Sequence, residues 1–397
     1  MGKRIMNKRI LIILGSLTLA LIGISFYLLT GGSESPADQA GSKAPMTADP
    51  TIMPGGTTDQ GQLKTSPREV LVHYTNWAKY PPDSRPLLPG HTDVINHERV
   101  HLPQQDMAAL VDGVIKKSHY ACRLQPMRHT VTEGEAMRVQ FYCTNEGRRV
   151  PVKVASFKLE RRLMEKRWPT GGMTVGDSGQ KGDSVAGDNI HTFHFKPKRS
   201  DWGSMFLDVK FTIPGDPLRA EYELKTSFFS SPVAPAKFTG RVREELRNGS
   251  LYLKVELNVR APGRYTIEGN LMANDGPIAF ARRDARLTKR GLTWVELEYF
   301  GKIFHDRGFA GPYKLVGLRG KRNNTAIDPD KLNGPPEQVA KYISAAQTTE
   351  PERQYMPLWS GKHETRAYQL KDFQDRVYDS EEKRARIKLL RGLIRDT

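Results

Sequence analysis

Apolar and polar residues alternate along several stretches in the middle of the chain, most clearly at 206–213, 251–260 and 294–299. A period of two predicts antiparallel β-strands with one buried face and one solvated face. Turn signals separate these stretches, among them Asn248-Gly249 and Asn274-Asp275-Gly276. The second is the strongest short-range hairpin signal in the sequence.

The spacing of these signals predicts a mainly β protein. We expect about six strands between 118 and 230 and about six more between 235 and 319, which fits two tandem immunoglobulin-like sandwiches at 118–231 and 232–322. Ser231-Pro232-Val233-Ala234-Pro235 then forms the hinge. One larger continuous β-structure is the alternative.

A different pattern begins the chain, where Ile10–Leu29 contains 20 residues without a charge. As a helix this segment is about 30 Å long, which matches a bilayer core. It is longer than the apolar core of a cleavable signal peptide, and no A-x-A-like site follows Leu29. The pattern predicts an uncleaved signal anchor at 10–30.

Flanking charges give this anchor a direction. Residues 1–9 hold four basic residues and no acidic one, so the positive-inside rule predicts a cytoplasmic N-terminus. The expected location is the inner membrane, crossed once, with the bulk of the protein in the periplasm.

Segments of low hydrophobicity and scattered helices surround the predicted sandwiches. Residues 31–66 are rich in Gly, Ser, Thr, Pro and Ala, which predicts a disordered linker. Within 67–117, a capping box at Ser66–Glu69 opens a helix that a Pro-rich extended segment follows. The 323–397 region is irregular, with a short helix from Pro336 and another that opens at Asp379-Ser380-Glu381-Glu382 and runs to about Ile394.

The last of these helices is basic and amphipathic. Such a helix can lie on anionic lipid or receive a partner, or dock its narrow apolar face on the sandwich, and docking is the preferred interpretation.

The net charge of +17 initially indicates a nucleic-acid partner. However, no basic stripe interleaved with aromatic residues is present, so we expect no nucleic acid. The charge fits a solvated surface better, or a surface near anionic lipid or cell-wall polymer.

Two cysteines are present, Cys122 and Cys143. If a turn lies at 132–135, strands 120–130 and 136–145 pair with Cys122 opposite Cys143. Opposed cysteines lie within disulfide reach, and export supplies an oxidising compartment. We therefore predict a disulfide, with two reduced buried thiols as the alternative.

One motif, His97-Glu98-Arg99-Val100-His101, matches H-E-x-x-H. On a helix, His97 and His101 converge on one zinc ion while Glu98 activates water. Pro103 limits any helix here, so the preferred interpretation is a surface loop without a metal.

A glycine-rich stretch over 171–187 predicts a long hairpin loop with binding potential. It lacks phosphate-loop spacing, and we expect no cofactor. Asp177, Asp183 and Asp188 are calcium candidates, but no spacing defines a site. No catalytic set can be placed.

The run from Tyr252 to Leu318 contains the segments GRYTIEGNL, ANDGPIAFA, GLTWVELEYFGKIF and FAGPYKLVGL, and YPPDSRPL precedes it at 80–87. It resembles a β-sandwich module of uncharacterised exported bacterial proteins. The resemblance implies a membrane-anchored envelope protein and transfers no active site.

The leading hypothesis is a non-enzymatic binding or scaffolding protein of the cell envelope, with envelope proteins as partners. A membrane-anchored metallohydrolase that uses His97, Glu98 and His101 is the second hypothesis. Recognition of an anionic wall polymer or lipid surface is the third.

Overall fold

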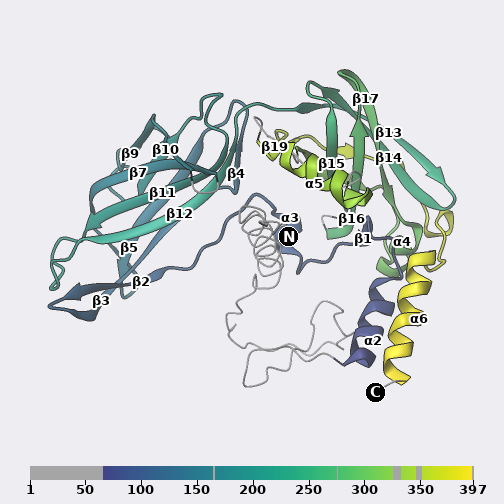
Figure 1. Ribbon diagram of the computed structural model, residues 1–397, viewed down its shortest axis with the longest axis horizontal. Coiled ribbons are helices and arrows are strands. Elements are labelled where there is room, and N and C mark those ends of the chain that lie inside the picture. Colours follow the sequence, from purple (N-terminus) through teal and green to yellow (C-terminus); the bar gives the residue numbers. More distant parts are fainter. Residues whose placement is uncertain (1–65, 164–165, 275, 325–331, 346–350, 396–397) are drawn as a thin grey trace, which may run out of the picture. The chain divides into compact units, whose positions relative to one another are not determined.

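The computed structural model describes residues 66–163, 166–274, 276–324, 332–345 and 351–395 (Figure 1). All of them belong to one compact unit, Gly55–Thr397. The predicted cytoplasmic tail, anchor and linker lie outside the described residues. Within the described part, no helix has the length and apolarity needed to cross a bilayer.

Two sheets enclose the first core. One has the order β2-β3-β5-β10-β9 with β6 beside β5, and the other has the order β4-β12-β11-β7-β8. Their bounds are β2 Gln105–Val111, β3 Val114–Pro126, β4 Thr130–Thr132, β5 Met137–Asn145, β6 Arg148–Val150, β7 Lys153–Leu163, β8 Lys166–Pro169, β9 Met173–Gly176, β10 His191–Phe195, β11 Gly203–Thr212 and β12 Tyr222–Ser231. Side chains from both sheets, including Phe141 and Phe211, form one buried cluster. The arrangement is therefore a two-layer sandwich.

This sandwich contains more strands than the six expected. Its first strand, β2, begins before residue 118, and several of the additional strands are only three to five residues long. Too few residues alternate in such strands for the pattern to reveal them. The predicted pairing of β3 with β5 is confirmed, since Cys122 faces Cys143 and Leu124 faces Phe141.

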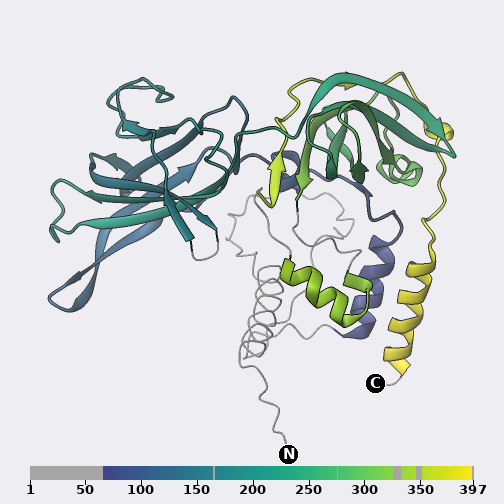
Figure 2. The same ribbon diagram turned by 45° about the horizontal axis from the view of Figure 1, so that its top comes forward.

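A second pair of sheets encloses another core. The sheet orders are β13-β14-β17 and β1-β16-β15-β18-β19, with β20 beside β18 (Figures 1 and 2). The bounds are β1 Ser84–Pro86, β13 Ala236–Arg247, β14 Ser250–Val259, β15 Gly263–Ala273, β16 Gly276–Leu287, β17 Gly291–Tyr299, β18 Lys314–Asn323, β19 Arg353–Tyr355 and β20 His363–Glu364. The six strands expected over 235–319 are β13 to β18. The short strands β1, β19 and β20 join them from distant parts of the chain.

Along 251–260 the apolar positions are buried as predicted, although the polar position Glu256 is buried as well. Leu251, Leu253, Val255 and Leu257 of β14 are buried in the core, while Asn258 is exposed. At the tip between β13 and β14, Asn248 and Gly249 have φ angles of 52° and 71°. Glycine adopts this left-handed conformation without strain, and asparagine tolerates it, so the Asn-Gly pair closes the hairpin as predicted.

The helices are α2 Pro67–Trp77, α3 Thr92–Ile95, α4 Gly301–Arg307, α5 Pro336–Ala345 and α6 Glu381–Arg395, with a 3-10 turn η2 at Leu370–Asp372. The predicted capping box at the start of α2 is confirmed, with Ser66 and Glu69 each accepting the other's backbone N–H.

Helix α4 was not expected. Helix α6 packs against α2 rather than against a sandwich.

Candidate functional site

The H-E-x-x-H segment does not form the helix that its zinc interpretation needs. Helix α3 ends at Ile95, and residues 96–98 form a turn. His101 is exposed, whereas His97 is half-buried and lines a pocket. Because residues 96–101 are not helical, His97 and His101 do not lie one turn apart on a helix face, as the zinc motif requires. Glu98 lines the same pocket as His97.

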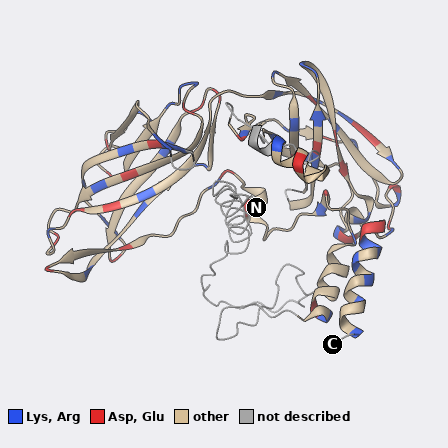
Figure 3. Ribbon diagram, in the orientation of Figure 1, with Lys and Arg blue, Asp and Glu red and all other residues tan. Residues whose placement is uncertain are grey.

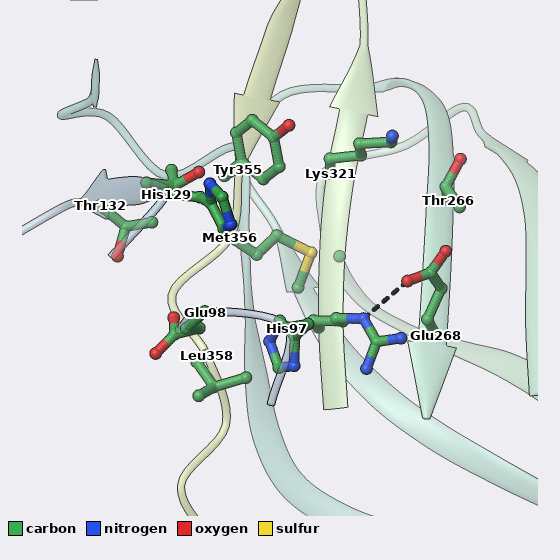
Figure 4. A pocket seen from close by; sticks show the side chains of 13 residues that line it. His97, Glu98, His129, Thr132, Thr266, Glu268, Lys321, Tyr355, Met356 and Leu358 are labelled. Carbon is green, nitrogen blue, oxygen red and sulfur yellow. Dashed lines mark hydrogen bonds and ion pairs between the residues drawn. The ribbon is translucent and has the colours of Figure 1, made fainter. Parts of the chain in front are cut away.

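We call this cavity the junction pocket because residues of both sandwiches line it. Its volume is about 280 Å³. The lining comes from segments 97–98, 129–132, 266–268, 319–321 and 355–358 (Figure 4). A cavity of this size is at the lower end of the range for small-molecule sites.

Strand pairing creates one wall of the pocket. In the β15–β18 ladder, Thr266 lies opposite Lys321 and Glu268 lies opposite Arg319. Alternate residues of a strand share a face, so these four side chains line the cavity together. Short strand β19 adds Tyr355 beside Lys321.

Charged groups in this wall are only partly hydrated. Arg319 Nε donates to Glu268 Oε2 at 2.7 Å, and both side chains are largely buried. Burial lowers the pKa of Lys321, against a smaller opposing effect of the Glu268 charge. A cation that has lost part of its hydration gains more from an anionic ligand than a fully solvated one does.

His97 is neutral in this setting. Burial, together with the charges of Arg319 and His129, lowers the pKa of His97 to about 4. Its Nδ1 is buried and, within the described residues, has no hydrogen-bond partner. A buried polar atom without a partner costs stability, so it is a place where a ligand or water group gains a bond.

Glu98 brings a carboxyl group to the opposite side of the pocket. Burial raises its pKa, partly offset by Arg128, whose Nε lies 3.7 Å from Glu98 Oε2. Met356 and Leu358 add apolar surface. The pocket therefore combines cations, a neutral imidazole, a carboxyl group and apolar contacts, which is a set suited to holding a small polar molecule.

Contacts beside the pocket hold the linker between the sandwiches, and we call them the Glu133 clamp. Glu133 accepts from the backbone N–H of Ala234 at 3.0 Å and from Lys237 Nζ at 2.7 Å, and it pairs with Arg260 at 2.8 Å. Burial alone raises the pKa of Glu133, but the hydrogen bonds from Lys237, Ala234 and Arg260 outweigh it and lower that pKa to about 2.

A second link joins β12 to β19. Tyr355 N donates to Ser231 Oγ at 2.8 Å. The ring of Tyr355 meets that of Phe229 edge-on, with centroids 5.3 Å apart. The predicted hinge segment, 231–235, is therefore bonded at both ends to residues outside it.

The structure brings Asp177, Asp183 and Asp188 together, with carboxylate oxygens within 4.8 Å of one another. Most of these oxygens accept backbone N–H groups of the same loop, such as those of Gly179, Gly187 and Asn189. Arg149 also pairs with Asp188 at 3.1 Å. These contacts hold the loop closed, and this structural role is enough to account for the cluster without a metal ion.

The two cysteines form a disulfide between β3 and β5. Both are fully buried in the first core. The bridge lies within the core and is not part of the junction pocket.

The sequence indicates His97 and Glu98 only as part of a zinc motif, and it does not indicate the other residues that line the pocket. The sequence pattern places Thr266 and Glu268 on one face of a strand, and Arg319 and Lys321 on one face of another. It does not reveal the register that brings these two strands together.

No known family profile matches the sequence, and no curated protein matches it. Among solved structures, a DUF4785 family protein from Legionella pneumophila shares 13% identity at a TM-score of 0.38, over 51% of this chain and 53% of that one. The FN1–FN3 domains of chicken CNTN1 share 9% identity at a TM-score of 0.23, over 62% of this chain and 63% of that one. This chain thus covers about half of the first structure and less than two thirds of the second. Both TM-scores lie below 0.5, so neither likeness carries an argument.

Proposed function

We propose that this chain is a binding protein of the cell envelope that holds a small polar ligand in the junction pocket. The carrying observation is that one pocket is lined both by His97, whose Nδ1 is buried and unpartnered in the described structure, and by the partly desolvated Lys321. A ligand that enters the pocket can form hydrogen bonds with both groups. Binding of this kind requires no chemical reaction.

The chemistry of the wall favours a ligand with one anionic group. Lys321 receives the anion, His97 bonds a hydroxyl or amide, and Met356 contacts an apolar edge. The volume of about 280 Å³ limits the ligand to the size of a sugar or an amino acid.

An extracytoplasmic location is part of the proposal. The sandwiches are immunoglobulin-like modules that Ile10–Leu29 anchors in the inner membrane, with residues 1–9 in the cytoplasm. The Cys122–Cys143 disulfide supports export, because such bonds persist mainly in oxidising compartments.

Binding can be tested on the purified full chain by the shift in its melting temperature. The panel consists of acetate, phosphate, glutamate and glucuronic acid. We expect at least one of them to stabilise the protein, and Lys321→Gln to weaken that binding on the order of tenfold or more, as for loss of a charge-assisted hydrogen bond.

Lys289→Gln is the matched control, because Lys289 is exposed and does not line the pocket. An effect of equal size in both variants would place binding elsewhere. Absence of stabilisation by every compound in the panel would count against a small anionic ligand.

Location requires a separate experiment. Carbonate extraction of membranes should leave the full chain in the pellet if Ile10–Leu29 spans the bilayer. Protease added to spheroplasts should then digest the sandwiches. Release into the supernatant would contradict the anchor.

Recognition of an anionic wall polymer is a second candidate, favoured by the net charge of +17. It predicts retention on a polyanion resin that is lost at moderate salt. The turn at 96–98 argues against the metallohydrolase hypothesis. Stoichiometric zinc in the purified protein, lost in His97→Ala, would be the decisive support for it.

A further inference from the structure

Helices α2 and α6 lie side by side, as both views show (Figures 1 and 2). Neither contributes substantially to a sandwich core: α2 has no buried residue and α6 has only Leu390. They form an open groove of about 890 Å³, lined by Arg68, Leu71, Val72, Arg384, Ile387, Lys388, Arg391, Ile394 and Arg395.

The groove combines apolar side chains with basic ones, and we call its five basic residues the rim. The apolar residues are Leu71, Val72, Ile387 and Ile394, and Val72 is 55% exposed. Five of the nine lining residues are Lys or Arg and none is acidic. An apolar strip between basic side chains is typical of a surface that lies on anionic lipid headgroups.

Most of this positive charge is not neutralised by the protein. Arg384 pairs with Asp379 at 2.8 Å. Within the part of the chain that the structure describes, no carboxylate pairs with Arg68, Lys388, Arg391 or Arg395. Basic residues recur along the length of α6 (Figure 3).

Acidic residues of the same helices are engaged or distant from the rim. Glu69 is held in the capping box with Ser66. Glu381 and Glu382 occupy the first turn of α6, whereas most of the rim residues belong to its second half. The rim therefore presents a net positive field.

Chain length brings this groove near a bilayer. Only residues 30–66 separate the proposed anchor from α2, which begins at Pro67. A flexible segment of this length has a root-mean-square reach of roughly 30–36 Å. This step rests on the anchor in the proposed function.

We propose that the α2–α6 groove binds the anionic headgroups of the membrane from which the chain emerges. Arg68, Lys388, Arg391 and Arg395 contact phosphate groups, and Val72 and Leu71 enter the interfacial layer between them. This contact fixes the start of the folded unit against the bilayer.

A fluorescent label in the groove tests this proposal on the full chain. Because the only two cysteines of the sequence are joined in the disulfide, Val72→Cys can be labelled selectively with an environment-sensitive dye. The protein is placed in nanodiscs of phosphatidylcholine, with or without phosphatidylglycerol. We expect a blue shift and an intensity gain only with phosphatidylglycerol, and loss of both at high salt.

Two control variants separate the groove from general effects. Leu389→Cys carries the same dye at a leucine of α6 that is 52% exposed and does not line the groove, so its emission should not change. Combined Lys388→Gln, Arg391→Gln and Arg395→Gln should lower the docked-to-undocked ratio on the order of 100-fold, since each cation contributes roughly fivefold. Arg286→Gln, Lys289→Gln and Arg290→Gln remove three exposed charges elsewhere and should have no effect.

Each competing occupant gives a different result, and each would overturn the proposal. A change in both lipid mixtures would indicate that another segment of this chain fills the groove. A change that depends on protein concentration in detergent would indicate a second copy. Quenching by soluble polyphosphate without a blue shift would indicate an anionic polymer.

No response of the dye, in protein that carbonate leaves in the membrane, refutes the headgroup contact and leaves the anchor intact. Release of the protein by carbonate refutes the anchor instead.

Discussion

At the scale of single residues, the junction pocket depends on a histidine that remains neutral. His97 has no partner for Nδ1 and lies near Arg319 and His129. Protonation would add a positive charge near Arg319 in a poorly hydrated space. The physical cost of that charge makes His97 one of the groups through which acid acts on the pocket.

This cost predicts a pH dependence of folding. The pKa of His97 is about 4 in the folded protein against an ordinary 6.5, so the unfolded chain binds the proton more tightly. The contribution is complete above about pH 6.5 and is lost as the pH falls towards 4, amounting to about 1–2 kcal/mol after solvent screening. Urea unfolding at pH 7.5 and pH 5 should show about 1 kcal/mol less loss of stability for His97→Gln than for the native protein, because about 60% of the effect is lost by pH 5.

His119→Gln provides the control, because His119 is exposed. It should lose as much stability on acidification as the native protein. Equal pH dependence in the native protein and in His97→Gln would contradict the assignment.

Gly301 illustrates a residue that packing determines. It starts α4, and a Cβ there would collide with the carbonyl oxygen of Gly249 and lie 2.8 Å from Gln374 N. Gly301→Ala should therefore destabilise the protein by about 1–3 kcal/mol, measured by urea unfolding. Gly90→Ala has no atom within 4 Å of the new Cβ and should be close to neutral.

At the scale of elements, the sequence predicts long strands and their nearest partners well. The β3–β5 register is the one expected from a turn at 132–135. The connection is longer than a tight hairpin, however, because it contains β4, which pairs with β12 in the other sheet. The register of β15 with β18 could not be predicted in this way. These strands are separated by β16, β17 and α4, and their pairing shifts between Glu268 and Asn270.

The same limit applies to docking. The apolar face of α6 is visible in the sequence, but a hydrophobic stripe does not identify its partner. That partner is α2, which lies about 300 residues earlier. Most of the candidate pocket was missed for the same reason, since its wall comes from β15, β18 and β19.

The disulfide offers a test at this scale. Cys122 and Cys143 are 21 residues apart, and a loop of this length closed by a bridge contributes about 3 kcal/mol. Combined Cys122→Ala and Cys143→Ala should lower the unfolding free energy by that order. Reductant should destabilise the native protein similarly and leave the double variant unchanged. Two titratable thiols in the unreduced native protein would refute the bridge.

At the scale of the whole molecule, the Glu133 clamp determines whether the sandwiches behave as one unit. Glu133 belongs to the β4–β5 turn of the first sandwich, whereas Lys237 and Arg260 belong to the second. Three donors converge on one carboxylate beside the linker. Since the Ser231–Tyr355 bonds are uncharged, the clamp is the part of this junction that acid can open.

Protonation of Glu133 should therefore separate the two unfolding transitions. Its pKa is about 2 in the folded state against an ordinary 4.5, so the clamp contributes fully above pH 4.5 and weakens as the pH falls towards 2, by about 1–2 kcal/mol in total after solvent screening. Glu133→Gln should show two calorimetric transitions at pH 7, whereas we expect the native protein to show two only in acid. Glu146→Gln, at an exposed turn, is the control and should show one transition at pH 7. If Glu133→Gln still unfolds in one transition at pH 7, the neutral junction contacts are sufficient to couple the sandwiches, and the junction pocket keeps its shape without the clamp.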